Sequence, residues 1–420
     1  MISTLKHQRQ AWSVLIVSTL AFTVCFMVWM MFGVIGIPIR DNLGLNATEF
    51  GLLMATPILA GSLVRLPLGL WMDRHCGRRT MAALLVVAVP GIWALSLATE
   101  YWHFLLASLF AGLAGGTFAI GTPYVARWFP RHQQGMAMGV YGSGNVGAAL
   151  NQIIAPTLLV AFGWHLVPQV YAVLMVMAVV VFWLFSSDEV ESSQAAKMTL
   201  SEQFRILREP RVLRYCQYYS VVFGGFVALS LWLVQYYVGE YGLNIRMAAL
   251  MAVFFTLPGT LARGLGGWLA DRHGAHAVTW WVMWVSWICL FLLSYPPTDL
   301  VVQTDLGQIS FHVGVSQHLF TALVCVLGIA WAFGRASIFK YISDDYPDQL
   351  GAVSGVVGMV GGLGGFVLPI LFGVVLDLTG IRSSAFMLLY GLVCISLIWM
   401  HWSEVRGTDV MGRQNAQLHH

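Results

Sequence analysis

The sequence predicts an all-α membrane protein with twelve transmembrane helices in two pseudo-symmetric six-helix bundles. Three observations predict this fold class: the composition, the number of long apolar segments, and a repeat that relates the two halves of the chain. Of the 420 residues, 58% are hydrophobic and only 10% are charged, and the mean hydropathy is +0.74. Soluble domains are about half apolar and about a quarter charged. We therefore expect the chain to fold within a lipid bilayer.

The apolar segments can be counted directly, because a helix needs about 20 residues to cross the ~30 Å hydrocarbon layer. Twelve spans are predicted, at residues 12–36, 49–71, 80–98, 103–126, 135–160, 165–186, 212–238, 247–270, 277–295, 317–341, 350–376 and 383–402. The first span follows a basic start but has no convincing signal-peptide cleavage site, so we expect it to be retained. An even number of spans places both termini on one side.

The positive charges predict which side that is. We place 17 of the 22 Lys and Arg residues, Arg335 among them, at one face of the membrane and three at the other. Basic residues concentrate in cytoplasmic loops. Both termini are therefore expected to be cytoplasmic, in a multi-pass protein of the inner membrane. Because the net charge of +3 reflects this orientation, we do not expect nucleic acid as a partner. Arg65 and Arg263 belong to neither face.

A polar segment divides the spans six and six. We predict an N-terminal bundle at residues 1–186, a cytoplasmic linker at 187–211, a C-terminal bundle at 212–402 and a cytoplasmic tail at 403–420. The two halves repeat one another. The second span carries an Arg-xxx-Gly-xxx-Asp-Arg pattern that begins at Arg65, and the eighth span carries the same pattern from Arg263, 198 residues later. The aspartate and arginine of the two copies are Asp73, Arg74, Asp271 and Arg272.

A second repeated pattern relates the fifth and eleventh spans. Gly135, Gly139 and Gly142 recur as Gly351, Gly355 and Gly358, at an offset of 216 residues. We attribute the extra 18 residues to an insertion at 296–316, outside the membrane. Duplicated six-helix halves with a binding site at their interface, near the midplane, are a known architecture of transporters.

The two arginines lie deep in their spans. Arg65 is eight residues before Asp73, which places its Cα roughly 12 Å from the helix end. An arginine at such depth costs on the order of 2.5 to 3.5 kcal/mol. None of the 19 Asp and Glu residues falls in the middle third of any span, so neither arginine has a protein counter-ion at its own depth. Snorkelling to the interface is the plain alternative, but the distance is long. We infer that the missing carboxylate is replaced by an anionic substrate, which planar guanidinium forks would bind by paired hydrogen bonds.

Several motifs resemble those of a known family. Gly69-xxx-Asp73-Arg74-xx-Gly77-Arg78-Arg79 resembles the signature loop of the major facilitator superfamily. More narrowly, the chain resembles the nitrate/nitrite porters of NarK type, in the motif at 29–33, in both arginines, and in the glycine-rich segments 142–147 and 358–366. The resemblance covers residues from about 12 to 402. It implies that nitrate and nitrite are the substrates. The mostly apolar walls likewise favour a small, weakly hydrated anion.

The resemblance also implies roles for individual residues. Arg65 and Arg263 would form the charge clamp, Asn145 and Tyr219 would donate hydrogen bonds, and Phe118 and Phe223 would lie above and below the anion. Without the resemblance, both phenylalanines would be taken as packing residues, and the amide of Asn145 as an interhelical hydrogen-bond donor. We add Gly144 and Gly358 to the substrate-binding set, since glycine exposes backbone to a ligand. A small hydroxyl is expected near the position of Gly358, and Ser354, one turn earlier, is a candidate substitute.

We expect alternating access, in which the two bundles rock about the central site. Asp73, Arg74, Asp271 and Arg272 are predicted to be conformational latches at the cytoplasmic helix ends, because exposed ion pairs are weak enough to open in each cycle. The glycine-rich segments are expected to let helices pack closely. Repulsion between two bare arginines in the empty site favours exchange of nitrate for nitrite. Proton symport stays open, because a proton could follow a peripheral route.

Two other classes of function are alternatives to nitrate and nitrite transport. A nitrate-reducing metabolism, such as nitrate assimilation, is the natural context for a nitrate and nitrite carrier. The nearest alternative is a transporter of another small anion, such as a carboxylate or a phosphate ester. A membrane sensor or enzyme on a transporter scaffold is the remote alternative, because the sequence has no HExxH motif and no phosphate-binding GxxxxGK[ST] loop. We expect no enzymatic activity, no cofactor, no metal and a functional monomer whose other partners are the bilayer and, in the symport case, protons.

Overall fold

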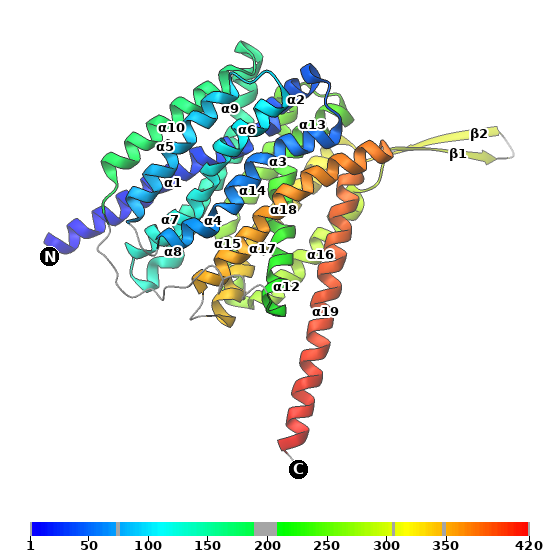
Figure 1. Cartoon of the computed structure of the whole chain (residues 1–420). Helices are drawn as coiled ribbons and strands as arrows, with labels where there is room; N and C mark the ends of the chain where they lie inside the picture. Colours follow the sequence, from blue (N-terminus) through cyan, green and yellow to red (C-terminus); the bar gives the residue numbers. More distant parts are fainter. Residues whose placement is uncertain (1, 73–75, 189–207, 305–306, 347–349, 419–420) are drawn as a thin grey trace.

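The structure is a computed structural model that describes residues 2–72, 76–188, 208–304, 307–346 and 350–418. Long helices run side by side through the body of the molecule, a β-hairpin projects from it, and the last helix extends well beyond it (Figure 1). Eleven continuous helical segments are long and apolar enough to cross a membrane, and one bent helix pair makes a twelfth span. The predicted fold class and the number of spans are confirmed.

The six N-terminal spans include several helices that are interrupted near their middle. In chain order they are α1 (Ile2–Met30) with α2 (Phe32–Leu43); α3 (Ala47–Leu63) with α4 (Arg65–Met72); α5 (Gly77–Leu95); α6 (Tyr101–Gly112), the 3₁₀ turn η1 (Leu113–Gly116) and α7 (Thr117–Arg127); α8 (Arg131–Gly142), the 3₁₀ turn η2 (Ser143–Val146) and α9 (Gly147–Phe162); and α10 (Leu166–Phe185).

The C-terminal spans are built in the same way. They are α12 (Pro210–Tyr219), the π-helical turn η3 (Ser220–Gly224) and α13 (Gly225–Tyr241); α14 (Ile245–Leu261) with α15 (Arg263–His273); α16 (Ala275–Leu293); α17 (Gln317–Asp345); α18 (Leu350–Thr379); and α19 (Ser384–Leu418). The linker predicted at 187–211 falls mostly on residues 189–207, which lie outside the described residues, so the domain division stays a prediction.

The insertion between α16 and α17 contains a feature that the sequence did not predict. Strands β1 (Thr298–Thr304) and β2 (Gly307–Val313) pair antiparallel, with Thr298 opposite Val313 and Thr304 opposite Gly307. The hairpin extends away from the helices (Figure 1). A predominantly polar stretch between two spans fits a position outside the hydrocarbon layer, but its length alone could not distinguish a loop from a hairpin.

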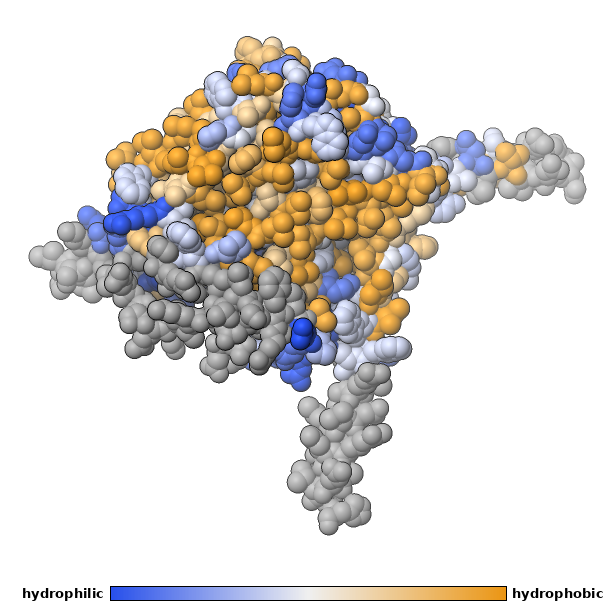
Figure 2. Space-filling view, in the orientation of Figure 1, coloured by the Kyte–Doolittle hydropathy of each residue, from blue (hydrophilic) through white to orange (hydrophobic). Residues whose placement is uncertain are grey.

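The outer surface of the helices is apolar. Large hydrophobic side chains such as Trp102 and Phe162 are 72% and 71% exposed. Figure 2 shows the apolar residues as a broad band across the middle of one face, with hydrophilic residues toward both ends. Exposed patches of this extent are not tolerated in water, so the band is the surface that contacts lipid.

The two halves pack closely at one end of the molecule. Asp377, near the end of α18, accepts a hydrogen bond from the backbone N–H of Thr48 (2.8 Å) at the start of α3. Gln152 of α9 donates to the carbonyl of Ser230 (3.2 Å) and accepts from the hydroxyl of Thr256 (2.7 Å). Each of these bonds joins the N-terminal half to the C-terminal half. This end is therefore closed by direct contacts between the halves.

The opposite end is open. α9 packs on α14 at the closed end, whereas their continuations α8 and α15 diverge. A Cβ atom placed on Gly135 or Gly139 of α8, on Gly264 or Gly267 of α15, or on Gly355 of α18 would meet nothing within 4 Å. Contact between the halves at one end and separation at the other is one of the two end states of an alternating-access carrier.

Candidate functional site

Both arginines of the repeat stand at breaks in their helices. α3 ends at Leu63 and α4 begins at Arg65, while α14 ends at Leu261 and α15 begins at Arg263, with a bend of 43° in the second case. Pro67 explains the first break, because it has no N–H to donate to the carbonyl of Leu63. The second break lies beside a glycine-rich segment, in which helical structure is weaker. The repeat thus extends from sequence to local backbone geometry.

Three other spans are irregular near the same site. η1 and η2 are 3₁₀ turns in the fourth and fifth spans, and η3 is a π-helical turn in the seventh. Each contributes to the surroundings of the arginines: η1 through the carbonyl of Gly115, η2 through Asn145, and η3 through Phe223. Short 3₁₀ and π segments within long helices frequently mark functional sites and hinges.

Arg65 connects the two halves. Its side chain is only 7% exposed. Nε donates to the carbonyl of Gly115 (3.4 Å) in its own half, and Nη1 donates to the carbonyl of Gly358 (3.0 Å) on α18, in the other half. Both acceptors are neutral, so the positive charge is held by hydrogen bonds without a counter-ion. The structure thus brings Arg65 and Gly358 together, as the predicted site requires.

Aromatic rings surround this guanidinium. Its Cζ lies 5.2 Å from the ring centroid of Trp29 and 5.7 Å from those of Phe118 and Phe223. These distances are within the range of cation–π attraction. Phe118 comes from the N-terminal half and Phe223 from the C-terminal half, so the two predicted aromatic plates do flank Arg65. Their contact with an anion stays a prediction.

Tyr219 and Phe223 share one face of the seventh span, as their spacing predicts. Their rings stack with centroids 5.1 Å apart, and Tyr219 also meets Phe339 of α17 edge to face at 5.2 Å. Close packing of α18 makes this possible, because a Cβ on Gly361 would collide with the Tyr219 ring. The glycine-rich segment of α18 therefore serves close helix packing, in agreement with the sequence-based expectation.

Arg263 reaches toward the N-terminal half. It is partly buried, and its Cζ lies 5.9 Å from the ring centroid of Phe339. Its Nη1 lies 3.0 Å from the point that a Cβ on Gly142, at the end of α8, would occupy. A side chain at position 142 would press against the guanidinium. The absence of a side chain at this position is what lets Arg263 approach the other half.

The remaining predicted binding residues lie near these groups. Asn145 is buried in η2, one turn after Gly142. Gly144 faces α1, since a Cβ there would collide with the ring of Phe22, so only its backbone could meet a ligand. Gly358 differs, because a Cβ at that position would meet nothing within 4 Å. Ser354, the candidate substitute for the hydroxyl, is partly buried one turn earlier on α18.

No carboxylate neutralises the arginines among the residues that the structure describes. The ion pairs found there join Arg78 to Asp188, Lys340 to Asp271 and Asp344, and Arg382 to Glu240. None of these pairs includes Arg65 or Arg263. The same residues contain no group of three His, Cys, Asp or Glu side chains that could hold a metal. Two arginines without a carboxylate partner among these residues are the arrangement that the predicted anion site requires.

The structure corrects one placement. The charge count put Arg335 at the cytoplasmic face, but its side chain is 0% exposed within the C-terminal half. It belongs to α17, which continues to Asp345, so Arg335 lies ten residues before the helix end, about 15 Å along the axis. The prediction was wrong because the tenth span was ended too early, at residue 341. The next acidic residues after Arg335 are Asp344 and Asp345, and their distance along the sequence could have indicated that the span continues past residue 341.

Arg335 packs against groups next to the site. Nε donates to the carbonyl of Trp331 (3.3 Å), and Nη2 donates to the carbonyl of Gly259 on α14. Its Cζ lies 4.1 Å from the ring centroid of Phe226. Nη1 is buried without a hydrogen-bond partner. Arg335 is close enough to Arg263 for the two positive charges to repel.

Two of the four predicted latch residues, Asp271 and Arg272, are described by the structure. Asp73 and Arg74 fall outside the described residues. Asp271 pairs with Lys340 of α17 at 3.7 Å, and the Arg272 guanidinium lies 5.5 Å from the ring centroid of Trp268. Both contacts are within the C-terminal half, and a role in switching stays a prediction.

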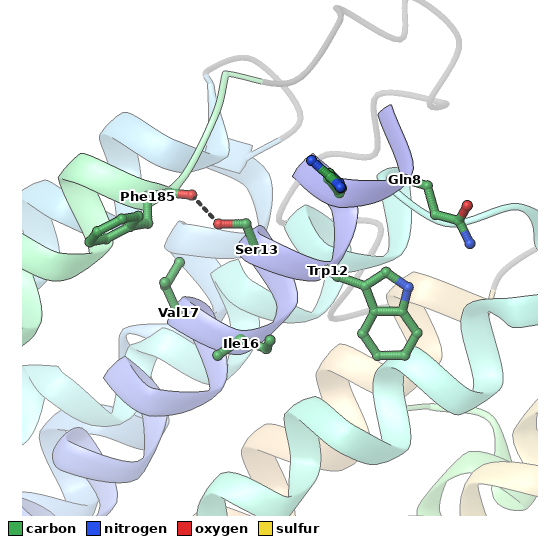
Figure 3. Close-up of a pocket in the computed structure, with 7 residues that line it drawn as sticks. Gln8, Trp12, Ser13, Ile16, Val17 and Phe185 are labelled. Carbon is green, nitrogen blue, oxygen red and sulfur yellow. Dashed lines mark hydrogen bonds between the residues drawn. The ribbon is translucent and has the colours of Figure 1, made fainter. Parts of the chain in front are cut away.

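One surface hollow lies away from these residues. It has a volume of about 640 Å³ and lies between the start of α1 and the end of α10, where Ser13 donates to the carbonyl of Phe185 at 2.7 Å (Figure 3). Trp12, Ile16 and Val17 give it a mostly apolar lining. An open apolar hollow on the outer surface fits a lipid-facing crevice. It contains none of the predicted site residues.

Comparison with known proteins agrees with this picture. The family profile described as the Major Facilitator Superfamily matches residues 17–369. A protein of Thermus thermophilus named as a probable nitrate/nitrite antiporter, NarK1, is 39% identical over 416 residues, covering 96% of this chain and 93% of the relative. The nitrite extrusion protein of Bacillus subtilis strain 168 is 28% identical over 391 residues, covering 92% and 93%. A probable nitrate transporter of Staphylococcus carnosus, NarT, is 28% identical over 389 residues, covering 92% and 95%.

A solved structure supports the fold independently. The crystal structure of a bacterial homolog of the human lysosomal transporter Spinster, in an inward-facing and unoccupied conformation, has a TM-score of 0.70 to this chain. The alignment covers 93% of this chain and 96% of that one, at 15% sequence identity. At this identity the likeness concerns the fold alone.

Proposed function

The chain belongs to the nitrate/nitrite porter family of the major facilitator superfamily, and from this membership we propose that it carries nitrate and nitrite across the cytoplasmic membrane by alternating access. The observation that supports the proposal most is that Arg65 and Arg263 each reach across to the other half, toward Gly358 and Gly142, with no carboxylate partner among the described residues. A planar monovalent oxyanion supplies the missing negative charge and accepts hydrogen bonds from two guanidinium forks.

The surroundings of the arginines favour a small anion. Phe118 and Phe223 flank the Arg65 guanidinium, and Asn145, buried in η2, and Tyr219, stacked on Phe223, are the proposed hydrogen-bond donors. A flat anion such as nitrate can stack between two rings while its oxygens face the arginines. A larger organic anion needs more polar groups than this lining offers. Nitrate and nitrite also appear in the names of the relatives.

The transport cycle follows from the two ends of the molecule. With the termini cytoplasmic, as the positive-inside rule predicts, the closed end with Asp377 is external and the open end with Gly135 is cytoplasmic. The structure is then inward-facing. The anion screens the positive charges while the halves close around it, and the empty carrier keeps them bare. We therefore propose that the loaded form reorients faster than the empty form, which produces exchange of nitrate for nitrite by a monomer in the inner membrane.

Uptake of labelled nitrate into proteoliposomes tests this proposal. Vesicles are loaded with nitrite, with nitrate or with neither, with and without a pH gradient. Exchange requires uptake that depends on internal anion and is insensitive to the pH gradient. Uptake into empty vesicles that follows an inward proton gradient would instead establish symport. Competition with sulfate, formate and a phosphate ester separates nitrate from other anions, and a protein that takes up none of the labelled nitrate contradicts the assignment.

A further inference from the structure

Arg335 carries a third positive charge close to the candidate site, in addition to those of Arg65 and Arg263. The proposed function assigns no role to this charge. Its side chain is 0% exposed, and two backbone carbonyls are its hydrogen-bond acceptors. We propose that Arg335 determines anion affinity by adding positive potential to the nitrate site from behind Arg263. This inference rests on the proposed function, since it assigns a role in the same site.

The first step of the argument is the unbalanced charge. Nη1 of Arg335 is buried without a hydrogen-bond partner, and no ion pair in the described part of the chain includes this side chain. A buried charge destabilises the fold unless it is paired. Packing alone would be served better by an apolar residue of similar volume. A buried arginine at this position is explained when an anion supplies the counter-charge.

The second step is its location relative to the site. Arg335 lies over Phe226, three residues after Phe223 in the seventh span, and donates to Gly259, four residues before Arg263 in the eighth. It therefore stands about one helical turn from two groups of the site, on the side toward the closed end. At that distance it adds to the attraction for an anion without touching it. Arg335 is a positioning residue in this scheme.

The third step is its effect on Arg263. Arg335 donates to the carbonyl of Gly259, one helical turn before Arg263, so the two positive charges are near each other and repel. Repulsion directs the Arg263 guanidinium away from the core of the C-terminal half and toward Gly142 of the N-terminal half, where the structure places it. An anion held between Arg263 and Arg65 relieves this repulsion. Arg335 thus favours both the extended position of Arg263 and its neutralisation by substrate.

Two substitutions separate charge from shape. Arg335→Gln removes the charge and keeps a hydrogen-bonding side chain, whereas Arg335→Lys keeps the charge and removes the planar fork. Arg246→Gln is the matched control, because Arg246 is exposed at the start of α14, far along the helix from Arg263. Nitrate affinity is measured by titration calorimetry on the full chain in detergent. The melting temperature is measured with and without saturating nitrate.

We expect Arg335→Gln to weaken nitrate binding about tenfold, the order of effect of a unit charge roughly 10 Å away in a partly screened interior. The same variant should melt at a higher temperature than the native protein in the absence of nitrate, because an unpaired buried charge is gone. Its nitrate-induced shift should shrink. Arg335→Lys should retain affinity within about threefold, and Arg246→Gln should match the native protein.

The outcomes distinguish this inference from the proposed function. Native protein that binds no nitrate contradicts the function and, with it, the role of Arg335. Native binding with unchanged affinity in Arg335→Gln overturns the inference alone. A Gln variant with a lower melting temperature and an unchanged nitrate shift shows a purely structural role. If Arg335→Gln does not fold, a loss of nitrate affinity of about tenfold or more in a folded Arg335→Lys shows that charge is not what matters and also overturns the inference.

Discussion

Arg65 donates through Nη1 to the carbonyl of Gly358 across the boundary between the two halves, over 3.0 Å. This bond links a charged group of one bundle to a neutral backbone acceptor of the other. A carbonyl carries only a partial negative charge, so an anion is the stronger acceptor. We therefore expect that substrate, on entering the proposed site, competes for or shares the guanidinium that connects the halves in this state. In this proposal, binding and conformational change are coupled through the same side chain.

Replacement of this arginine should affect binding strongly. Arg65→Lys keeps a positive charge but loses the fork that reaches both Gly115 and Gly358. Loss of charge-assisted hydrogen bonds costs about 1.5 to 3 kcal/mol, so we expect nitrate affinity to fall roughly 10- to 100-fold. The measurement is nitrate titration of the purified protein, with Arg246→Lys as the control. Affinity within twofold of the native value would show that the fork is not used.

Two glycines of α18 should respond in opposite ways to the same added methyl group. A Cβ on Gly362 would collide with the Ser62 side chain and lie 3.5 Å from Nη1 of Arg65, whereas a Cβ on Gly358 would meet nothing within 4 Å. Overpacking of this kind costs about 1 to 3 kcal/mol. We expect Gly362→Ala to lower the melting temperature and nitrate uptake, and Gly358→Ala to change neither by much. Equal effects of the two variants would contradict the placement of α18.

The closure of the end that carries Asp377 should depend on this carboxylate. Its carboxylate caps α3 of the other half, accepting from the N–H groups of Ala47 and Thr48. Loss of a helix cap costs about 1 kcal/mol, so Asp377→Asn should raise the proportion of outward-open molecules about fivefold. Spin labels at Asp41 and Arg246, which are exposed at this end, report the separation of the halves.

Glu240→Gln is the control for that experiment. Glu240 pairs with Arg382 at 3.8 Å within the C-terminal half, so this substitution removes an acidic charge at the same end without touching the boundary. We expect its distance distribution to match the native one. A longer separation in both variants would mean that surface charge, and not the cap on α3, holds this end closed.

The sequence predicted most of the fold, and it singled out the arginines of the candidate site, because both carry strong signals. Twelve apolar segments are read directly from their length, and Arg65 and Arg263 stand out because arginine is expensive in an apolar span. The repeat placed both arginines at the same depth. The stacking of Tyr219 on Phe223 followed from their spacing of four residues, which puts them on one helical face.

Other features gave weaker signals. Arg335 was misplaced because a charge near the end of a span can lie in a loop or in the core, and only the full length of α17 decides between the two. The breaks at Arg65 and Arg263 depend on packing between distant spans. The cap that Asp377 makes on α3 joins residues more than 300 positions apart, and no local pattern identifies such a pair.

The central claim is that substrate replaces a carboxylate that the chain lacks at the arginines, and a carboxylate built into the site tests it most directly. A Cβ at Gly142 would lie 3.0 Å from Nη1 of Arg263, so Gly142→Asp places a carboxylate beside that guanidinium, and Gly142→Asn provides the uncharged match. Nitrate affinity is the measurement. We predict that the Asp variant loses nitrate binding and melts at a higher temperature without nitrate than the Asn variant, which still binds. Equal nitrate affinity in the two variants would contradict the claim.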